Sequence, residues 1–381
     1  MKNENILITG GAGFIGQHLT RRLLKEGFNV RIIDNFSPQV HDTDTLPPDL
    51  VPHVDLIKAD IRDREAMKGV LKGIDRIVHL AAETGTGQSM YEIDKYFSIN
   101  VQGTAILLNL LQGGKVKERI KSIVLASSRA VYGEGAYHCS EHGTVYPEQR
   151  NWDSMSSGEF EPICPECCQK VNLLPTSESA PFKPMSIYGL TKQVQEQAVL
   201  LYAQISGING IALRYQNVYG PGQSLKNPYT GILAVFSNLA RQNQNIEIYE
   251  DGLESRDFIY IDDVVEYTIR SLQYQGNFTG ALNVGSGEQV TVATIASEVK
   301  KFFNSSSSIL IAEKFRIGDI RHNIAEMQLA QRILGYTSKI KFKEGLNSFL
   351  TWAAAEPEQD KSAYQRSVAE LTEKNLMESI R

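Results

Sequence analysis

Short apolar runs alternate with amphipathic stretches along the first half of the chain. Between the first two runs apolar residues recur at helical spacing, and Gly27 marks the end of the expected helix. This strand–helix alternation predicts an α/β fold built on a doubly wound parallel sheet. The expected buried strands are Ile6–Ile8, Val30–Ile33, Asp55–Ile57, Arg76–Leu80, Ser122–Leu125 and Gly210–Leu213.

Residues 136–176 interrupt this alternation with a polar stretch that contains several prolines, and we interpret them as an insertion. Beyond residue 215 the pattern becomes α+β with longer loops, which predicts a smaller second domain. From Glu356 the chain is polar and charged, and we expect a surface helix near Val368–Ile380. The expected division is a first domain at 1–135 and 177–214 with a return segment near 258–280, the insertion at 136–176, a second domain at 215–257 and 281–352, and a tail at 353–381.

The composition narrows the class of protein. The chain has 381 residues, of which 42% are hydrophobic and 22% charged, and its formal net charge is -5. This composition is ordinary for a globular protein, and the acidic balance argues against nucleic-acid or polybasic membrane binding. No apolar run reaches the roughly 20 residues of a membrane-spanning helix, and no signal-peptide core follows the N-terminus. We therefore expect a cytoplasmic protein whose partners include neither a membrane nor a nucleic acid.

A glycine-rich turn joins the first expected strand to the first helix. Gly10, Gly13 and Gly16 stand at G-x-x-G-x-x-G spacing. Small residues let the backbone approach a pyrophosphate, and the helix N-terminus supplies N–H donors and a positive dipole end. Asp34 closes the second strand, where an acid meets the adenosine ribose hydroxyls, and Asn35 brings no cation for a 2′-phosphate. The pattern indicates a site for NAD rather than NADP; a plain turn, with Asp34 as its cap, is the alternative.

A tyrosine and a lysine are spaced for acid–base chemistry. Tyr188 and Lys192 are four residues apart, so a helix that begins after Ser186 as its N-cap places both on one face. A nearby ammonium lowers the pKa of a phenol, as a general base near neutral pH requires. Ser127 and Ser128 follow the fifth strand at the carboxyl edge of the sheet, where ligands of such sheets bind. A hydroxyl there could bind the substrate oxygen that Tyr188 deprotonates, although each feature alone is more often structural.

Taken together, these motifs resemble the extended short-chain dehydrogenase/reductases that act on nucleotide sugars. The resemblance covers residues 1–135 and about 177–345. It implies a Rossmann-type sheet, a smaller substrate domain, NAD as cofactor, a nucleotide-diphosphate sugar as substrate and a helix-bundle homodimer. The matching segments are Thr9–Gly16, Asp34, Asp60-Ile61, His79–Ala82, Asn100, Ser127–Gly133, Tyr188 with Lys192, Arg214–Gly222 and Arg256–Val264.

The resemblance also assigns roles to individual residues. Tyr188 is expected to be the base, Lys192 its partner and Ser128 the catalytic hydroxyl. Arg256 is expected to bind the diphosphate, a role that suits a permanently charged guanidinium. The residues expected to hold NAD are Gly10, Gly13, Phe14, Ile15, Gly16, Asp34, Asn35, Asp60, Ile61, Leu80, Ala81, Ala82, Asn100, Tyr188 and Lys192. Those expected on the substrate side are Glu83, Ser127, Ser128, Asn217, Arg256, Arg316 and Asp319.

The residues that follow Ser128 favour one reaction of this family. The 4,6-dehydratases typically carry an Asp-Glu pair there, whereas this chain has Arg129 and Ala130. A 4-epimerase needs only the base, its lysine, the hydroxyl and room for a 4-keto sugar to turn over, with hydride returning to the opposite face. Glu83 could reach the sugar as a second acid or base, which leaves C3/C5 epimerisation or decarboxylation open.

All four cysteines lie in the insertion, where Cys139 and His142 are followed by Cys164 and Cys167. This C-x₂-H…C-x₂-C spacing supplies four ligands for tetrahedral zinc, and because it leaves no position for water the metal is expected to be structural. Cys168 or His138 could replace one ligand, and free thiols are the alternative. Together with the epimerase motifs, the insertion resembles that of bacterial dTDP-L-rhamnose 4-epimerases, which interconvert dTDP-L-rhamnose and dTDP-6-deoxy-L-talose.

Other functions remain open from the sequence alone. The same scaffold carries UDP-hexose and UDP-uronate 4-epimerases, reductases that release NADH, and dehydratases. A catalytically silent NAD-binding regulator is the alternative outside enzymes, and the presence of both Tyr188 and Lys192 argues against it. A zinc-ribbon nucleic-acid module is disfavoured because residues 136–176 have no basic patch.

Overall fold

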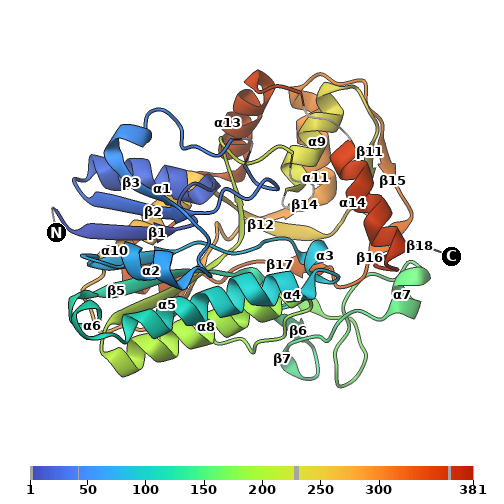
Figure 1. Cartoon of the computed structure of the whole chain (residues 1–381). Coiled ribbons are helices and arrows are strands. Elements are labelled where there is room, and N and C mark those ends of the chain that lie inside the picture. The colour runs from blue at the N-terminus through green and yellow to red at the C-terminus, as the bar shows by residue number, and fades with distance from the viewer. Residues whose placement is uncertain (1–2, 42, 227–230, 359–361, 381) are drawn as a thin grey trace.

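The computed structural model describes residues 3–41, 43–226, 231–358 and 362–380 (Figure 1). A seven-stranded parallel sheet forms the larger part of the molecule, with the strand order β13-β9-β5-β4-β1-β2-β3. This order confirms the α/β class and the doubly wound sheet. The strands are β1 (Asn5–Thr9), β2 (Asn29–Asp34), β3 (Val54–Lys58), β4 (Arg76–His79), β5 (Ser122–Ser128), β9 (Asn209–Tyr215) and β13 (Gly280–Val284).

Strand β13 lies where we expected the second domain to resume. It pairs with β9 in parallel, from Gly280 opposite Ile211 to Val284 opposite Tyr215. The return segment of the first domain therefore extends to residue 284 rather than 280. The run is short and follows a turn, so its apolar residues alone did not distinguish a seventh parallel strand from a loop of the smaller domain.

Helices cover both faces of this sheet, and alternate strand residues reach opposite cores. Ile6 and Ile8 pack into the core beneath α1 (Phe14–Lys25) and α10 (Ile261–Gln273), whereas Leu7 packs into the core beneath α5 (Gly103–Leu111) and α8 (Ile187–Ser206). All seven residues of β5 are buried, as expected for a parallel strand between two helical layers. The second layer contains α2 (Arg64–Val70), α5 (Gly103–Leu111), α6 (Gly114–Arg119) and α8 (Ile187–Ser206), preceded by α3 (Thr86–Ser89), α4 (Ile93–Tyr96) and the π-helix Phe97–Gln102.

A smaller domain packs against the carboxyl edge of the sheet, at the upper right of Figure 1. Its mixed sheet joins β10 (Asn217–Tyr219), β12 (Ser255–Tyr260), β14 (Gln289–Thr291) and β17 (His322–Asn323), and β11 (Ile246–Ile248) pairs with β15 (Ile309–Ile311). Its helices are α9 (Ile232–Arg241), α11 (Val292–Phe302), α12 (Gln328–Leu334) and α13 (Phe342–Ala355). Short helical turns lie at Val51–His53 and Arg129–Val131.

The cysteine-rich stretch folds as a small separate unit at the lower right of Figure 1. It contains a three-stranded sheet of β6 (Tyr137–Cys139), β7 (Gly143–Val145) and β8 (Asn172–Leu173). Helix α7 (Trp152–Ser156) lies between β7 and β8 in the sequence. Its apolar core is small and contains Tyr137, Val145 and two of the cysteines. So few buried apolar residues stabilise the unit only weakly, which is consistent with a metal or an external contact as the main source of order.

The C-terminal tail differs from our expectation of one helix near Val368–Ile380. Helix α14 spans Ser362–Glu373, and the chain then forms strand β18 (Met377–Ser379), which pairs antiparallel with β16 (Lys314–Arg316). Asn375 has a φ of 56°, a left-handed conformation that ends the helix. Met377 of β18 is buried, and this apolar contact favours the strand over a continuation of the helix. Among the described residues, no helix is both long and apolar enough to cross a membrane.

Candidate active site

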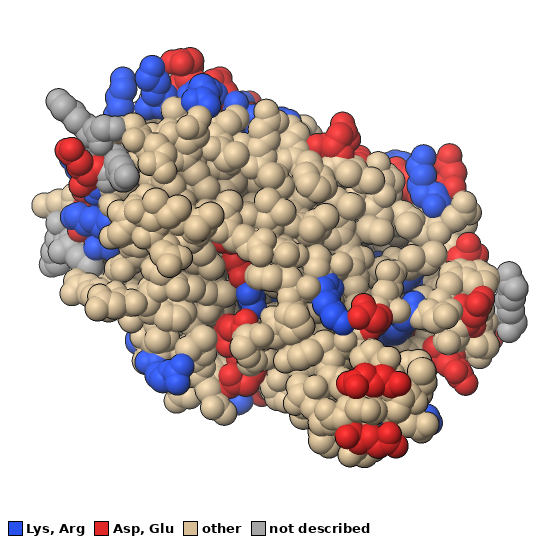
Figure 2. Space-filling model, turned by 90° about the horizontal axis from the view of Figure 1, so that it is seen from below, with Lys and Arg blue, Asp and Glu red and all other residues tan. Residues whose placement is uncertain are grey.

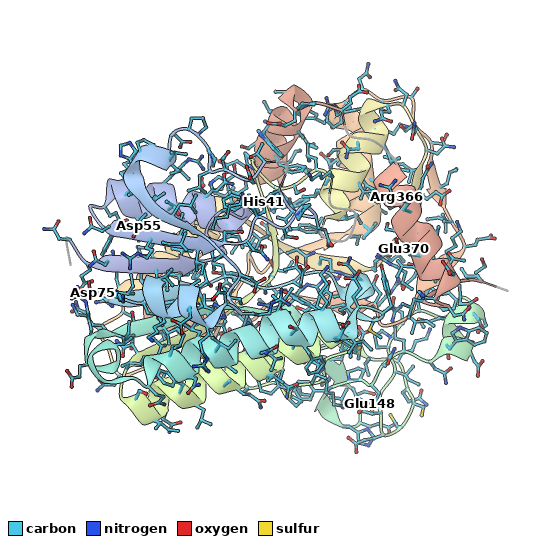
Figure 3. All side chains as sticks on the ribbon, viewed as in Figure 1. His41, Asp55, Asp75, Glu148, Arg366 and Glu370 are labelled. Carbon is cyan, nitrogen blue, oxygen red and sulfur yellow. The ribbon has the colours of Figure 1, made fainter. Side chains whose placement is uncertain are left out.

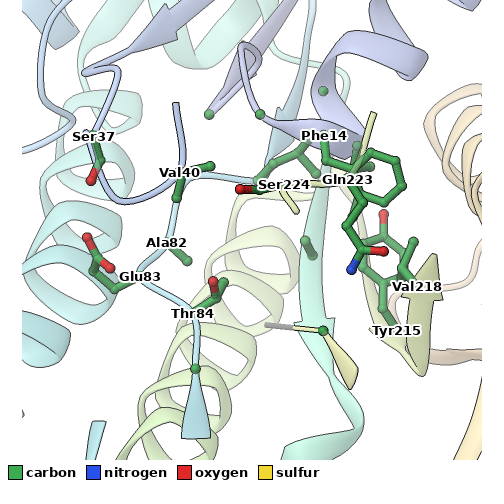
Figure 4. Close-up of a pocket in the computed structure, with 18 of the residues that line it drawn as sticks. Phe14, Ser37, Val40, Ala82, Glu83, Thr84, Tyr215, Val218, Gln223 and Ser224 are labelled. Carbon is green, nitrogen blue, oxygen red and sulfur yellow. The ribbon is translucent and has the colours of Figure 1, made fainter. Parts of the chain in front are cut away.

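A cavity of about 1120 Å³ lies between the carboxyl edge of the seven-stranded sheet and the smaller domain. Figure 4 shows Ala82, Glu83 and Thr84 on the loop that leaves β4, and Phe14 and Tyr215 on another side of the cavity. The residues that line it include nearly every position expected to bind NAD or substrate. These are Gly10, Gly13, Phe14, Ile15, Gly16, Asp34, Asn35, Asp60, Ile61, Leu80, Ala81, Ala82, Glu83, Ser127, Ser128, Tyr188, Lys192, Asn217, Arg256, Arg316 and Asp319.

The glycine turn packs its backbone directly against its neighbours. Gly10 has a φ of 69°, and a Cβ atom there would lie 2.8 Å from the backbone of Ala81. A Cβ on Gly16 would lie 2.6 Å from Gly11, so a side chain at either position would push the turn away from the sheet. The turn thus leaves the N-terminus of α1 open to the cavity, the geometry that binds a pyrophosphate.

Acidic residues at the ends of β2 and β3 shape the same end of the cavity. Asp34 accepts hydrogen bonds from the backbone N–H groups of Ala12 (3.0 Å) and Phe36 (2.9 Å), which fixes its carboxylate beside the glycine turn. Asn35 donates to Asp60 at 3.1 Å, and Arg62 pairs with the same carboxylate at 2.8 Å. The hydrogen bond from Arg62 lowers the pKa of Asp60. Both acids are therefore held as oriented acceptors.

Asn100, expected in the helix beneath the site and among the cofactor residues, lies in the π-helix beside the cavity-lining residue Glu83. Its side chain is fully buried in the π-helix, where Oδ1 accepts from the Glu83 N–H at 2.8 Å and Nδ2 donates to the Glu83 carbonyl at 3.1 Å. Nδ2 also lies 3.0 Å from Thr191 Oγ1. These bonds occupy the amide, so Asn100 joins the loop that carries Glu83 to the helix that carries Tyr188 and Lys192.

Helix α8 places the tyrosine and lysine together, as their spacing predicts. The Ser186 side chain accepts from the Gly189 N–H at 3.1 Å, which confirms it as the N-cap. The Lys192 ammonium donates to the Ala126 carbonyl at 2.9 Å and lies 6.0 Å from the centre of the Tyr188 ring. Ser128 ends β5 beside them, and its Oγ accepts from the Ala130 N–H at 3.2 Å.

The charges around Tyr188 differ from those we expected. Burial raises the pKa of Tyr188, while the hydrogen bond with Ser128 and the charge of Arg129 act in the opposite direction. Burial also lowers the pKa of Lys192 to about 7. The same burial thus disfavours both the ionised phenol of Tyr188 and the ammonium of Lys192. Ser128 and Arg129 both favour the tyrosinate.

Replacing Lys192 by Met is expected to stabilise the fold while removing activity. The pKa of Lys192 is near 10.5 in the unfolded chain but only about 7 in the folded chain. The unfolded state thus binds more protons between these values, and the resulting penalty grows as the pH falls from about 10.5 to 7. Thermal unfolding without cofactor should show a larger gain in Tm for Lys192→Met over wild type at pH 7 than at pH 9.5. An equal or absent gain at both pH values would contradict this charge assignment.

The substrate side of the cavity contains a row of arginines around one acid. Asp319 pairs with Arg256 at 3.2 Å and with Arg316 at 2.9 Å. Burial alone would raise the pKa of Asp319, but the surrounding arginines lower it to about 2. Arg256 is further fixed by the carbonyls of Ser255 and Arg321, both at 2.9 Å. This arrangement presents fixed positive charge to an anion such as a diphosphate.

Two other substrate-side candidates differ in how far they face the cavity. Ser127 is buried, and its hydroxyl donates to Glu196 at 2.6 Å, so its side chain is occupied within the fold. Glu83 reaches the cavity and lies 3.6 Å from Lys95. Burial raises the pKa of Glu83, while Lys95 acts to lower it. Glu83 is therefore the better placed of the two for contact with a sugar.

Arg129 is the main residue that we did not assign to the site from the sequence. It lines the cavity beside Tyr188, and its Nε donates to Asn217 Oδ1 at 2.7 Å. Burial, and secondarily the charge of Arg256, lowers the pKa of Arg129 to about 9. Its position directly after Ser128, the expected catalytic hydroxyl, was a usable signal, which we applied only to exclude dehydration. Gln216, Tyr249 and Tyr364 also line the cavity and were not expected.

The four predicted metal ligands converge in the insertion. The ligand atoms of Cys139, His142, Cys164 and Cys167 all lie within 4.8 Å of one another. His142 Nδ1 lies 3.6 Å from the sulfurs of both Cys139 and Cys164, and the sulfurs of Cys139 and Cys167 are also 3.6 Å apart. Cys168 is exposed and outside this group, as is His138.

A network of buried charges joins the insertion to the substrate side. Arg150 of the insertion pairs with Glu250 at 2.8 Å and with Glu134 at 3.2 Å, and it donates to the Asp319 carbonyl at 2.9 Å. Arg321, whose side chain is fully buried, pairs with Glu250 at 3.0 Å and with Glu161 of the insertion at 2.7 Å. The insertion is thus connected by charge to the loop that carries Asp319.

The fold and the site define an NAD-dependent enzyme of nucleotide-sugar chemistry. The chain belongs to the NAD dependent epimerase/dehydratase family, which it matches over residues 6–152 and 155–285. It is 35% identical to a dTDP-L-rhamnose 4-epimerase of Burkholderia thailandensis over 93% of this chain and 96% of that protein.

Solved structures show the same likeness. The UDP-glucose 4-epimerase of Thermotoga maritima with UDP-glucose is 26% identical, with a TM-score of 0.73 over 91% of this chain and 98% of that one. The UDP-glucuronic acid 4-epimerase of Bacillus cereus, in complex with UDP-glucuronic acid and NAD, is 25% identical, with a TM-score of 0.71 over 92% and 99%. These comparisons confirm the expected family and fold.

Proposed function

We propose that the protein is a nucleotide-sugar 4-epimerase and that its substrate pair is dTDP-L-rhamnose and dTDP-6-deoxy-L-talose. The choice of epimerisation rests on the surroundings of Tyr188. It shares the cavity with Ser128, Lys192 and Arg129, and the residues at positions 129 and 130 are not carboxylates. A dehydratase needs an added acid and base there, whereas an epimerase does not. The likeness to the Burkholderia enzyme supports the choice of sugar.

The reaction requires one proton to leave the C4 hydroxyl and one hydride to leave C4, and both must return. Tyr188 takes the proton of the C4 hydroxyl, Ser128 holds the C4 oxygen, and Lys192 stabilises the tyrosinate. NAD held by the glycine turn, Asp34 and the β4 loop would supply the hydride acceptor. After the 4-keto sugar turns over, Tyr188 returns its proton as hydride reaches the opposite face, so no net oxidation occurs. Arg256 and Arg316 bind the diphosphate while the sugar turns.

The test is incubation of the purified protein with dTDP-L-rhamnose and separation of the products by chromatography and NMR. A C4-inverted sugar of unchanged mass supports the proposal. Loss of one water would show that the exclusion of dehydration was wrong, and NADH release would indicate net oxidation of the sugar instead of epimerisation. No change with any nucleotide sugar would favour the NAD-binding regulator.

One observation favours a second substrate. Arg129 places a guanidinium beside Tyr188, at the end of the cavity where the sugar must lie. A carboxylate at C6 of a UDP-uronate is a chemically suitable partner for it. UDP-glucuronic acid therefore belongs in the same assay. Faster turnover of the uronate than of dTDP-L-rhamnose would assign the protein as a uronate 4-epimerase.

We also propose that the insertion holds a structural zinc ion. Zinc–sulfur bonds of about 2.3 Å in a tetrahedron place neighbouring sulfurs roughly 3.8 Å apart. The sulfurs of Cys139 and Cys167 are 3.6 Å apart, and the ligand atoms of all four residues lie within 4.8 Å of one another, which fits such a site. Three thiolates and one imidazole fill the tetrahedron, so the ion would order the insertion without taking part in the reaction.

We further propose that two copies associate through α5 and α8. The segment from Phe97 to Gln112 contains no charged residue, and the two charged residues of α8, Lys192 and Glu196, are both buried. Figure 2, which views the molecule from below, shows a broad area without charged side chains on this face. Leu201 and Ile205 are 58% and 68% exposed there, which is unfavourable unless another surface covers them.

The double variant Leu201→Glu/Ile205→Glu is expected to be monomeric, whereas the wild type is expected to be a dimer. Two charges on each facing helix would repel one another across the interface. Light scattering coupled to size-exclusion chromatography measures the mass directly. Val51→Glu changes an apolar residue of similar exposure, 53%, away from these helices and should leave the dimer intact. A wild-type mass near that of one chain would reject the proposed interface.

A further inference from the structure

The C-terminal segment lies across the cleft between the two domains. Strand β18 pairs with β16 of the smaller domain, and Tyr91 of the larger domain donates a hydrogen bond to Glu370 at 2.8 Å. Leu371 is buried, and its Cδ2 atom lies 3.4 Å from the position of a Cβ atom on Gly87. Figure 3 shows Glu370 and Arg366 on this helix, α14. The segment is thus anchored on both sides of the cleft.

Helix α14 also contributes a side chain to the cavity. Tyr364 lines it together with Tyr249 and Arg316. The hydroxyls of Tyr364 and Tyr249 are 3.0 Å apart, and the Arg316 guanidinium lies 5.3 Å from the centre of the Tyr249 ring. Two aromatic rings and a guanidinium thus meet at this end of the cavity. Such groups recognise a planar, polar ring by stacking and hydrogen bonding.

The order of the contacts shows which part of a substrate would reach this end. The sugar must lie at Tyr188 and Arg129, where the reaction occurs. Next to them, Asp319 joins Arg256 and Arg316, which suit a diphosphate. Arg316 in turn stacks on Tyr249, which contacts Tyr364. The group attached to the outer phosphate, the nucleoside, therefore lies against the two tyrosines.

We propose that the C-terminal segment completes the nucleotide subsite and that Tyr364, with Tyr249, contacts the pyrimidine nucleoside of the substrate. The proposal rests on a nucleotide sugar as the substrate of the proposed function. It assigns a role in binding to the tail, whose polar sequence indicated none. A chain that ended before α14 would leave this end of the cleft open to water.

The test measures binding of dTDP and UDP by titration calorimetry, which does not require turnover. Tyr364→Ala is expected to weaken the Kd of dTDP by about tenfold, in line with the loss of one aromatic–base contact. NAD content should not change, because Tyr364 lies at the other end of the cavity. Gln365→Ala changes the exposed neighbour on the same helix and should bind dTDP as the wild type does. A Kd for Tyr364→Ala within twofold of wild type would overturn the proposal.

A second variant separates binding from folding. Tyr364→Phe keeps the ring but removes the hydroxyl next to Tyr249, and we expect about threefold weaker dTDP binding with an unchanged Tm. With the true sugar substrate, both variants should raise KM more than they lower kcat. Absence of epimerisation by the wild type would reject the proposed reaction, whereas dTDP binding unaffected by either variant would reject the role of Tyr364.

Discussion

Tyr188→Phe is expected to lower kcat by about 10²- to 10⁴-fold, the usual contribution of a positioned general base. The phenylalanine ring fills the same space beside Tyr96, whose ring centre lies 6.4 Å from that of Tyr188, so the fold should be preserved. Only the phenol oxygen, which exchanges the proton of the C4 hydroxyl, is lost. NAD content and the Kd of dTDP should therefore stay close to wild type while epimerisation, followed by NMR, becomes very slow.

A matched control is available on the same helix. Tyr202 is buried in the core beneath α8, away from the cavity, and Tyr202→Phe removes a hydroxyl of the same kind. Its kcat should remain within about twofold of wild type, because surface or core hydroxyls far from the chemistry do not enter the transition state. Epimerisation by Tyr188→Phe at a rate near that of wild type would mean that another group is the base, and Glu83 would be examined next.

The double variant Cys164→Ser/Cys167→Ser is expected to lose the metal and the order of the insertion. Structural zinc contributes roughly 10–16 kcal/mol to the folding of small zinc-binding peptides, whereas the apolar core of the insertion is small. Atomic spectroscopy should find about one zinc per wild-type chain and almost none in the variant. Limited proteolysis should then cut the variant, but not the wild type, between residues 137 and 175.

The same variant should also bind substrate less well. Arg150 donates to the Asp319 carbonyl, so a disordered insertion would release the loop that pairs with Arg256 and Arg316. We expect KM to rise more than kcat falls. Cys168→Ser is the control, because Cys168 is exposed and outside the ligand group. Equal zinc content in the double variant and the control would disprove this ligand set.

Much of the larger domain was predictable because each of its elements has a local cause. Apolar runs between helices gave six of the seven strands, and Ser186 marked the start of α8. β13 was missed because its pairing with β9 depends on a partner far away in the sequence. The tail was mistaken for one helix, since only the docking of Met377 and its pairing with β16 make β18 a strand.

The site was predictable where the chemistry is tied to a spacing, as at the glycine turn, at Tyr188 with Lys192 and at the cysteine pairs. Asn100 was assigned to the cofactor by resemblance, and its link to the loop that carries Glu83 appears only when its hydrogen bonds are seen. The pKa of Tyr188 depends on how far the fold shields the phenol from water, which no spacing reveals. Tyr364 carried no signal, because a single tyrosine in a polar tail reaches the cavity only through the strand pairing that positions α14.

The buried charges between the insertion and the smaller domain limit how this protein can change in evolution. Excision of residues 137–175 would remove Arg150 and Glu161, so the fully buried Glu134 would lose Arg150, whereas Arg321 would keep Glu250 and Asp251. A buried charge that loses its partner costs about 3–5 kcal/mol. A shorter, viable descendant would therefore need a replacement at Glu134 and, because Glu250 would lose one of its two arginines, a change at Glu250 as well. The insertion and these distant positions are expected to be inherited, and to be lost, together.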